Sequence, residues 1–142
     1  MKINSLRFFI LLLLALVVFP ASAAGARSPA ALAMAFVQAF RGGQVNSLVA
    51  LHYYPGGQTD PGRDRGAWRS LLKKYRLSGY RVANLDGADR ARLVRQRPGS
   101  ALAPLKKFVV QLDPLRSGRQ LVLERYIVAV NDSYYFLVLA VR

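Results

Sequence analysis

The sequence contains no cysteine, and only one histidine and one tryptophan, in 142 residues. The absence of cysteine excludes disulfides, thiolate metal ligands and cysteine nucleophiles, so packing alone has to stabilise the fold. One histidine and seven scattered carboxylates do not make a typical ligand set, and we predict no metal site. A glycine-rich phosphate loop and a serine nucleophile elbow are also missing, and we predict no cofactor.

Long apolar runs are scarce too, since the longest continuous one covers only residues 8–19. A helix needs about 20 apolar residues to cross a bilayer, although a membrane anchor remains an alternative for this run. Basic residues precede it and small residues follow it, with an A-x-A pattern at residues 21–23, which is typical of a secretory signal peptide. We therefore expect residues 1–23 to be removed and residues 24–142 to form one exported domain, periplasmic or secreted.

Acidic residues are few, because 7 Asp and Glu stand against 21 Lys and Arg, for a formal net charge of +14. A charge of this size favours anionic partners, which outside the cytoplasm are anionic lipid, glycan or an acidic protein surface. A well-solvated surface from an arginine-rich proteome is the alternative. Nucleic acid is not favoured, because export argues against it and aromatic residues do not alternate with the basic ones.

Helical patterns fill the first half of the mature chain and strand patterns fill the second. The predicted helices run from Pro29 to the Gly42-Gly43 pair, from Gln44 or Val45 to about Tyr53, and from Arg65 to Leu77. The predicted strands are residues 80–85, 91–97, 105–112, 119–130 and 133–141, with a turn at 86–89 and a tight hairpin at 131–132. The predicted fold class is α+β, with three N-terminal helices packed on a curved antiparallel sheet of about five strands.

The last two predicted strands are apolar on both faces, whereas an antiparallel sheet with one wet face alternates apolar and polar residues. The N-terminal helices can cover only one of these faces. We therefore expect the other face to meet a pocket wall, a partner or a second copy of the chain, which predicts a homodimer through the sheet face.

The run AFVQAFRGGQVNSLVALHYYPGG, residues 35–57, is similar to the opening of nuclear-transport-factor-like (cystatin-like α+β) domains. It has an amphipathic helix, a Gly-polar break, a Leu-x-x-Leu helix and an aromatic-Pro exit. The resemblance implies a cone in which the sheet curls around the helices and leaves a hydrophobic cavity, and dimers through the outer sheet face. It leaves function open, since this superfamily ranges from isomerases and dehydratases to non-catalytic adaptors.

Two groups of residues are weak candidates for catalysis. Glu124 is the only carboxylate in the middle of a predicted strand, on an apolar face, although pairing with a cross-strand cation such as Arg95 or Lys107 explains it better. His52 and Tyr54 form a possible donor pair at the mouth of a pocket. The simpler interpretation places His52 at the C-terminal end of a helix, where the helix dipole favours it, with the tyrosines packed on the sheet.

A cationic stripe on the third predicted helix is the candidate anion-binding surface. Its members, spaced by four, four and three residues, are Arg65, Arg69, Lys73 and Arg76. We therefore expect an exported, non-catalytic binding or assembly domain at the cell envelope. A small-molecule-binding protein or an isomerase- or dehydratase-like enzyme, using the cavity between helices and sheet, is the alternative.

Overall fold

The computed structural model describes residues 25–54, 61–95 and 102–138, and the predicted signal peptide lies outside them. The helices are α2 (Pro29–Arg41), α3 (Val45–Ala50), α4 (Pro61–Lys74) and α5 (Gly87–Arg95). The strands are β1 (His52–Tyr53), β2 (Tyr75–Ala83), β3 (Lys106–Pro114), β4 (Leu121–Val130) and β5 (Ser133–Leu137). No helix in the described ranges is both long and apolar enough to span a membrane.

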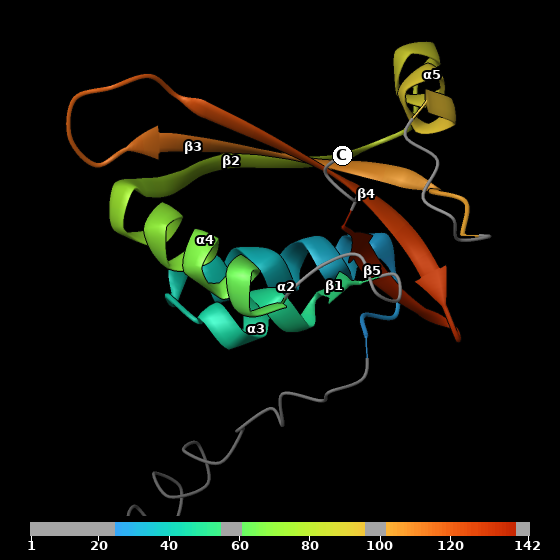
Figure 1. Cartoon of the computed structure of the whole chain (residues 1–142), viewed down its shortest axis with the longest axis horizontal. Coiled ribbons are helices and arrows are strands. Elements are labelled where there is room, and N and C mark those ends of the chain that lie inside the picture. Colours follow the sequence, from blue (N-terminus) through green and yellow to red (C-terminus); the bar gives the residue numbers. More distant parts are fainter. Residues whose placement is uncertain (1–24, 55–60, 96–101, 139–142) are drawn as a thin grey trace, which may run out of the picture.

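The five strands form one sheet in the order β1-β5-β4-β3-β2, with α2, α3 and α4 packed against one face (Figure 1). The pairings of β2 with β3, β3 with β4 and β4 with β5 are antiparallel, whereas β1 runs parallel to β5. The predicted α+β class and the three N-terminal helices are therefore confirmed, and the sheet is mixed because a two-residue segment adds a parallel edge.

Helix α2 supplies the centre of the core, as its apolar stripe predicts. Ser28 caps the N-terminus of the helix, and its hydroxyl oxygen accepts a hydrogen bond from the Ala31 N–H at 3.0 Å. After the C-terminus of the helix, Gly43 has a φ of 64°, a value that glycine adopts without strain. Phe36 packs with ring centroids 5.1 Å from Phe108 and 5.7 Å from Phe136. One helix therefore contacts β3 and β5, the strands on either side of the central strand β4.

The third helix was predicted too late in the sequence, because residues 75–77 belong to β2. Tyr75 and Leu77 face the helices opposite Pro114 and Leu112, and Arg76 between them is exposed. Ser78 is an extra residue in the strand, a bulge that donates a hydrogen bond to the Gln111 carbonyl at 3.1 Å. The predicted helix end at Ser78-Gly79 is this bulge.

The predicted turn at residues 86–89 and strand at 91–97 are also wrong, since α5 occupies Gly87–Arg95 and residues 96–101 lie outside the described ranges. Asp86 and Asp89 form a reciprocal cap: the Asp89 N–H donates to Asp86 Oδ1 at 2.8 Å, and the Asp86 N–H donates to Asp89 Oδ2 at 3.0 Å. Closely spaced aspartates are typical of turns as well as of helix caps, which explains why the sequence alone suggested a turn here.

Substituting Asp86 with alanine is expected to lower the free energy of unfolding by about 1 kcal/mol, because the first turn of α5 loses its capping oxygen. Urea denaturation measures the change. Asp86→Asn is the matched control, since asparagine keeps the accepting oxygen and is an equally good cap. An equal loss in both variants would show that the carboxylate charge matters and the cap does not.

Helix α5 lies on the sheet face opposite the other helices (Figure 1). There Tyr126, Val128 and Leu137 are buried in a second small core, against which Leu85 and Leu93 pack. We expected this face of β4 and β5 to be covered by something other than the N-terminal helices. Helix α5 of the same chain covers part of it. Val122, at the other end of β4, keeps 50% of its surface exposed.

A buried ion pair connects this second core to the sheet. Lys107 Nζ lies 2.8 Å from Asp89 Oδ2, and Asp89 is only 2% exposed. The Lys107 ammonium and the cap of α5 hold the pKa of Asp89 down at about 2. The charges of the pair are mutually satisfied, which marks it as a structural link between α5 and β3.

Candidate functional site

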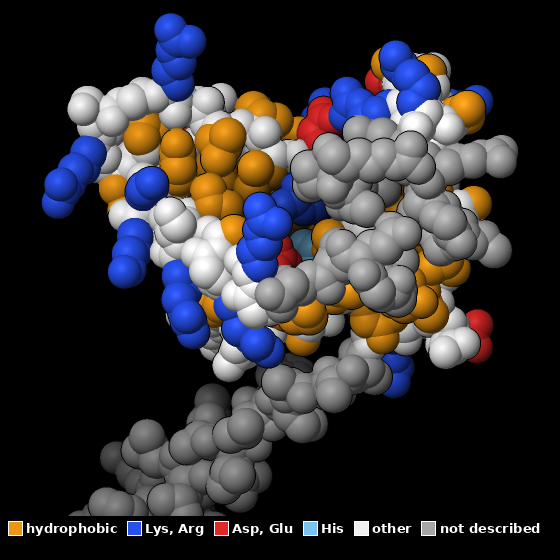
Figure 2. Space-filling view, viewed as in Figure 1, with side chains coloured by type: hydrophobic (Ala, Val, Ile, Leu, Met, Phe, Trp, Pro, Cys, Tyr) orange, Lys and Arg blue, Asp and Glu red, His pale blue; other side chains and the backbone are white. Residues whose placement is uncertain are grey.

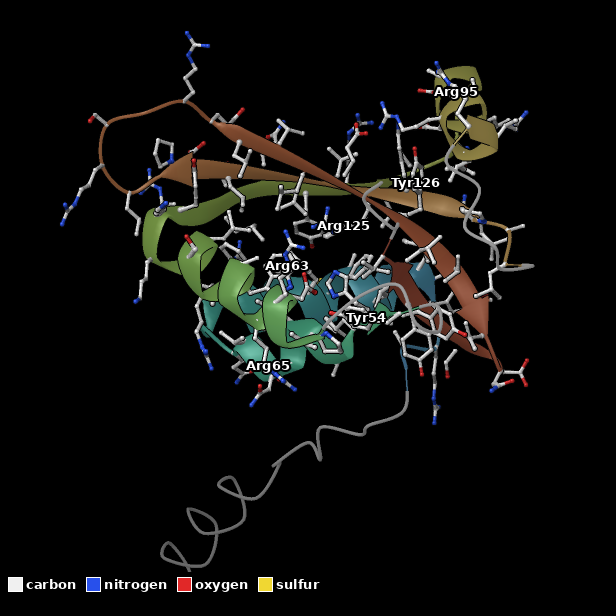
Figure 3. All side chains as sticks on the ribbon, viewed as in Figure 1. Tyr54, Arg63, Arg65, Arg95, Arg125 and Tyr126 are labelled. Carbon is white, nitrogen blue, oxygen red and sulfur yellow. The ribbon has the colours of Figure 1, made fainter. Side chains whose placement is uncertain are left out.

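A cluster of polar and aromatic side chains lies between α4 and the inner face of the sheet. His52 and Tyr54 come from β1 and the residue that follows it, Asp64 and Trp68 from α4, and Arg125 from the middle of β4. Figure 3 shows Arg125 reaching from the sheet toward α4, with Arg63 on the side of α4 that faces it. In Figure 2 the pale-blue histidine is visible through a small opening in this face, next to basic and acidic side chains.

His52 is buried, with 6% of its surface exposed, and lies among aromatic rings. Its ring centroid is 5.5 Å from that of Trp68 and 5.4 Å from that of Phe136. Nδ1 donates a 2.7 Å hydrogen bond to the Leu48 carbonyl, which fixes the proton on Nδ1. Nε2 then presents a lone pair that has no hydrogen-bond partner among the described residues.

The pKa of His52 is lowered from 6.5 to about 4, mainly by burial, and the nearby positive charge of Arg125 acts in the same direction. The bond to the Leu48 carbonyl and the negative charge of Asp64 oppose this shift. The imidazole is therefore neutral near pH 7. The helix-end interpretation placed His52 on the last turn of a helix, whereas α3 ends at Ala50 and His52 begins β1. Its ring still bonds to the Leu48 carbonyl of α3.

Asp64 connects the two sides of the cluster. Its Oδ2 accepts hydrogen bonds from the Tyr54 hydroxyl and from Trp68 Nε1, the latter at 3.3 Å. Burial and the bond to Asp64 raise the pKa of Tyr54 above its usual range, so the phenol stays protonated. Tyr54 therefore lies within this polar cluster, whereas the simpler interpretation placed it against the sheet.

Arg125 is the charged group of the cluster. Its guanidinium carbon lies 5.8 Å from the centroid of the Trp68 ring, which places the cation on an aromatic face. Nη1 donates to the Glu124 carbonyl at 3.1 Å, and no carboxylate forms an ion pair with Arg125 within the described part of the chain. Burial lowers the pKa of Arg125, and the negative charge of Asp64, which forms no direct ion pair with the guanidinium, opposes this shift.

The other catalytic candidate, Glu124, lies outside this cluster. Its side chain is on the outer face of β4, 37% exposed, and pairs with Arg92 of α5 at 3.3 Å. The predicted cross-strand partners, Arg95 and Lys107, are not the ones it contacts in the structure. The helix that replaced the predicted strand supplies the partner, and the pair is an ordinary surface ion pair.

The predicted cationic stripe is divided between two elements. Arg65, Arg69 and Lys73 are exposed along α4, and Figure 3 shows Arg65 directed away from the sheet. Arg76 is on β2, because the helix ends at Lys74. No cluster of three metal-ligating side chains occurs in residues 25–54, 61–95 and 102–138.

The sequence interpretation missed Asp64, Trp68 and Arg125 as parts of one site. Arg125 could have been identified from the sequence, because it interrupts the apolar inner face of β4 between Leu123 and Ile127. A cation at an inward position of an otherwise apolar strand marks a buried charge. Comparison with known proteins finds no matching family model and no significant match among curated proteins or solved structures.

Proposed function

We propose that this protein is an exported binding protein that holds a small organic carboxylate between α4 and the sheet, with Arg125 as the charged partner. One observation carries the proposal: a mostly buried guanidinium that no described carboxylate pairs with. A buried charge costs free energy unless an opposite charge satisfies it. A ligand carboxylate satisfies it in the bidentate geometry that guanidinium favours.

The surroundings favour a single negative charge on an apolar body. Trp68 lies against the cation and His52 lies beside Trp68, so the guanidinium has aromatic neighbours of low polarity. Asp64 adds a negative charge to the cluster, and it would repel a doubly charged phosphate more strongly than a carboxylate. The nuclear-transport-factor-like resemblance and the leader-like N-terminus support a cavity-type binding domain outside the cytoplasm.

The alternative is a proton-transfer enzyme, and the bond from Tyr54 to Asp64 favours it. Two features favour binding instead. The pKa of His52, about 4, makes its Nε2 a weak base near pH 7, and this atom is buried next to Trp68 and Phe136. Asp64 already accepts from two donors, which weakens it as a base.

Benzoate is the probe that tests the proposal, because the chain has one tryptophan and Trp68 lies beside Arg125. Benzoate is expected to change Trp68 fluorescence in a saturable manner, and the neutral amide benzamide is not. Arg125→Gln is expected to weaken benzoate binding at least about tenfold, since one charge-assisted pair contributes roughly 1.5–3 kcal/mol.

Arg81→Gln is the matched control, because Arg81 is an exposed strand arginine on β2 and its loss changes the net charge equally. It is expected to leave benzoate binding unchanged. Arg125→Lys keeps the charge and loses the planar fork, so we expect intermediate affinity. Equal binding of benzoate and benzamide, or equal affinity in Arg125→Gln and the wild type, would rule the proposal out.

A further inference from the structure

The end of the molecule where β3 turns into β4 carries an excess of positive charge without ion pairs. Its five exposed cations are Lys73 and Lys74 of α4, Arg76 of β2, and Arg116 and Arg119 of the loop between β3 and β4. The ion pairs of the described residues all involve Arg92 or Lys107, and none involves these five. Figure 2 shows blue side chains spread over this end of the face in view.

A cavity of about 380 Å³ opens among these cations. Lys73, Lys74, Arg116 and Ser117 are among the residues that line it, so three cationic residues and one hydroxyl-bearing residue surround one space. The Leu115 N–H donates to the Lys74 carbonyl at 2.9 Å, which connects the loop to the end of α4. A space lined by several cationic donors suits a phosphate group.

An apolar side chain stands among the same charges. Leu115 lines the cavity and keeps 55% of its surface exposed, directly next to Arg116. Val122, at the beginning of β4, is 50% exposed near the same end. Exposed aliphatic residues inside a group of lysines and arginines are typical of surfaces that lie in a membrane interface.

We propose that this end of the protein docks on an anionic bilayer, with the phosphate of a lipid head group in the cavity and Leu115 in the acyl boundary. The surface is separate from the Arg125 cluster, and the proposal does not depend on the ligand of that cluster. The complementary charge argues for a phosphate-bearing surface, and the exposed leucine argues for a lipid source over a soluble phosphate.

Vesicle co-sedimentation of the full chain tests the proposal, using phosphatidylcholine alone and phosphatidylcholine mixed with phosphatidylglycerol. The measured quantity is the ratio of binding to the mixed and to the neutral vesicles. The triple variant Lys73→Gln, Lys74→Gln, Arg116→Gln is expected to lower this ratio by at least tenfold. Residues 1–24 are identical in all variants, so their own contribution cancels in the comparison.

The triple variant Arg81→Gln, Arg90→Gln, Arg95→Gln is the matched control, since these exposed arginines lie on β2 toward α5 and on α5 itself. It removes the same charge and is expected to change the ratio less than twofold. Leu115→Ser is expected to reduce the binding that survives 0.5 M salt. Equal losses in the two triple variants would mean that net charge alone drives binding and would overturn the proposal.

Two further arms distinguish the sources of the anion. Inorganic phosphate at 10 mM, with ionic strength held constant, is expected to compete only partly with the vesicles, because Leu115 adds an apolar contact that free phosphate cannot replace. Binding of inorganic phosphate by the protein, without a preference for mixed over neutral vesicles, would assign the cavity to a soluble phosphate. Retention on a carboxylated polymer without retention on mixed vesicles would assign it to an acidic glycan, and either result would overturn the bilayer proposal.

Discussion

Replacing Phe36 with alanine is expected to lower the free energy of unfolding by about 4 kcal/mol, the largest stability effect of any variant considered for this chain. Phe36 is 1% exposed, and its ring contacts the rings of Phe40, Trp68, Phe108 and Phe136 at centroid distances of 5.9, 5.6, 5.1 and 5.7 Å. These neighbours belong to α2, α4, β3 and β5. Removing the ring leaves a cavity between four elements. The cavity can close only if all four elements move, so we expect most of it to remain.

Urea unfolding followed by Trp68 fluorescence measures the effect, because Trp68 contacts the substituted position directly. Met34→Ala on the same helix is the control, since Met34 is 47% exposed and its loss is expected to cost less than about 1 kcal/mol. A loss below about 1.5 kcal/mol for Phe36→Ala would contradict the view that one aromatic ring organises the inner core.

The local parts of the fold were predictable from the sequence for a physical reason. The stripe, cap and glycine stop of α2 lie within a few residues of one another, and each acts on its own turn of helix. The hairpin at Asn131 and Asp132 is equally local, and both residues adopt a positive φ, 48° and 62°, as predicted. Such signals need no knowledge of the rest of the chain.

The errors occurred where a pattern fits two structures and a distant contact decides between them. Residues 87–95 alternate weakly and carry several arginines, so a strand is compatible with them. The segment is a helix because Asp86 and Asp89 cap it and because Leu93 finds Tyr126 and Val128 on the sheet. That contact is between residues far apart in the sequence, so the apolar periodicity within residues 87–95 cannot predict it.

The candidate site was predictable only in part, for the same reason. His52 and Tyr54 were singled out because they are two residues apart and chemically distinctive. Arg125 reaches them from a strand far along the chain, and only the pairing of β1 with β5 and of β5 with β4 brings it there. A side chain's inward position on a strand can be inferred from alternation, whereas its partners require the sheet order.

Acidification from pH 7 to pH 4 is expected to remove about 3 kcal/mol of stability through His52 alone. The pKa of His52 is about 4 in the folded protein, against 6.5 in the unfolded chain. Below pH 6.5 the His52 side chain binds a proton in the unfolded chain but stays neutral in the folded chain. The contribution to stability is therefore complete above pH 6.5 and is lost as the pH falls toward 4. Arg125 strengthens this effect and Asp64 opposes it.

Urea unfolding at pH intervals of half a unit measures the slope, and His52→Asn is the comparison. The asparagine amide can donate to the Leu48 carbonyl in place of Nδ1, but it does not titrate. We expect a flat profile for this variant between pH 6.5 and 4.5, where Asp89, with its pKa of about 2, contributes little. Because the slope is independent of absolute stability, a weaker but folded variant still decides the question, and an unchanged slope would falsify the assignment of the transition to His52.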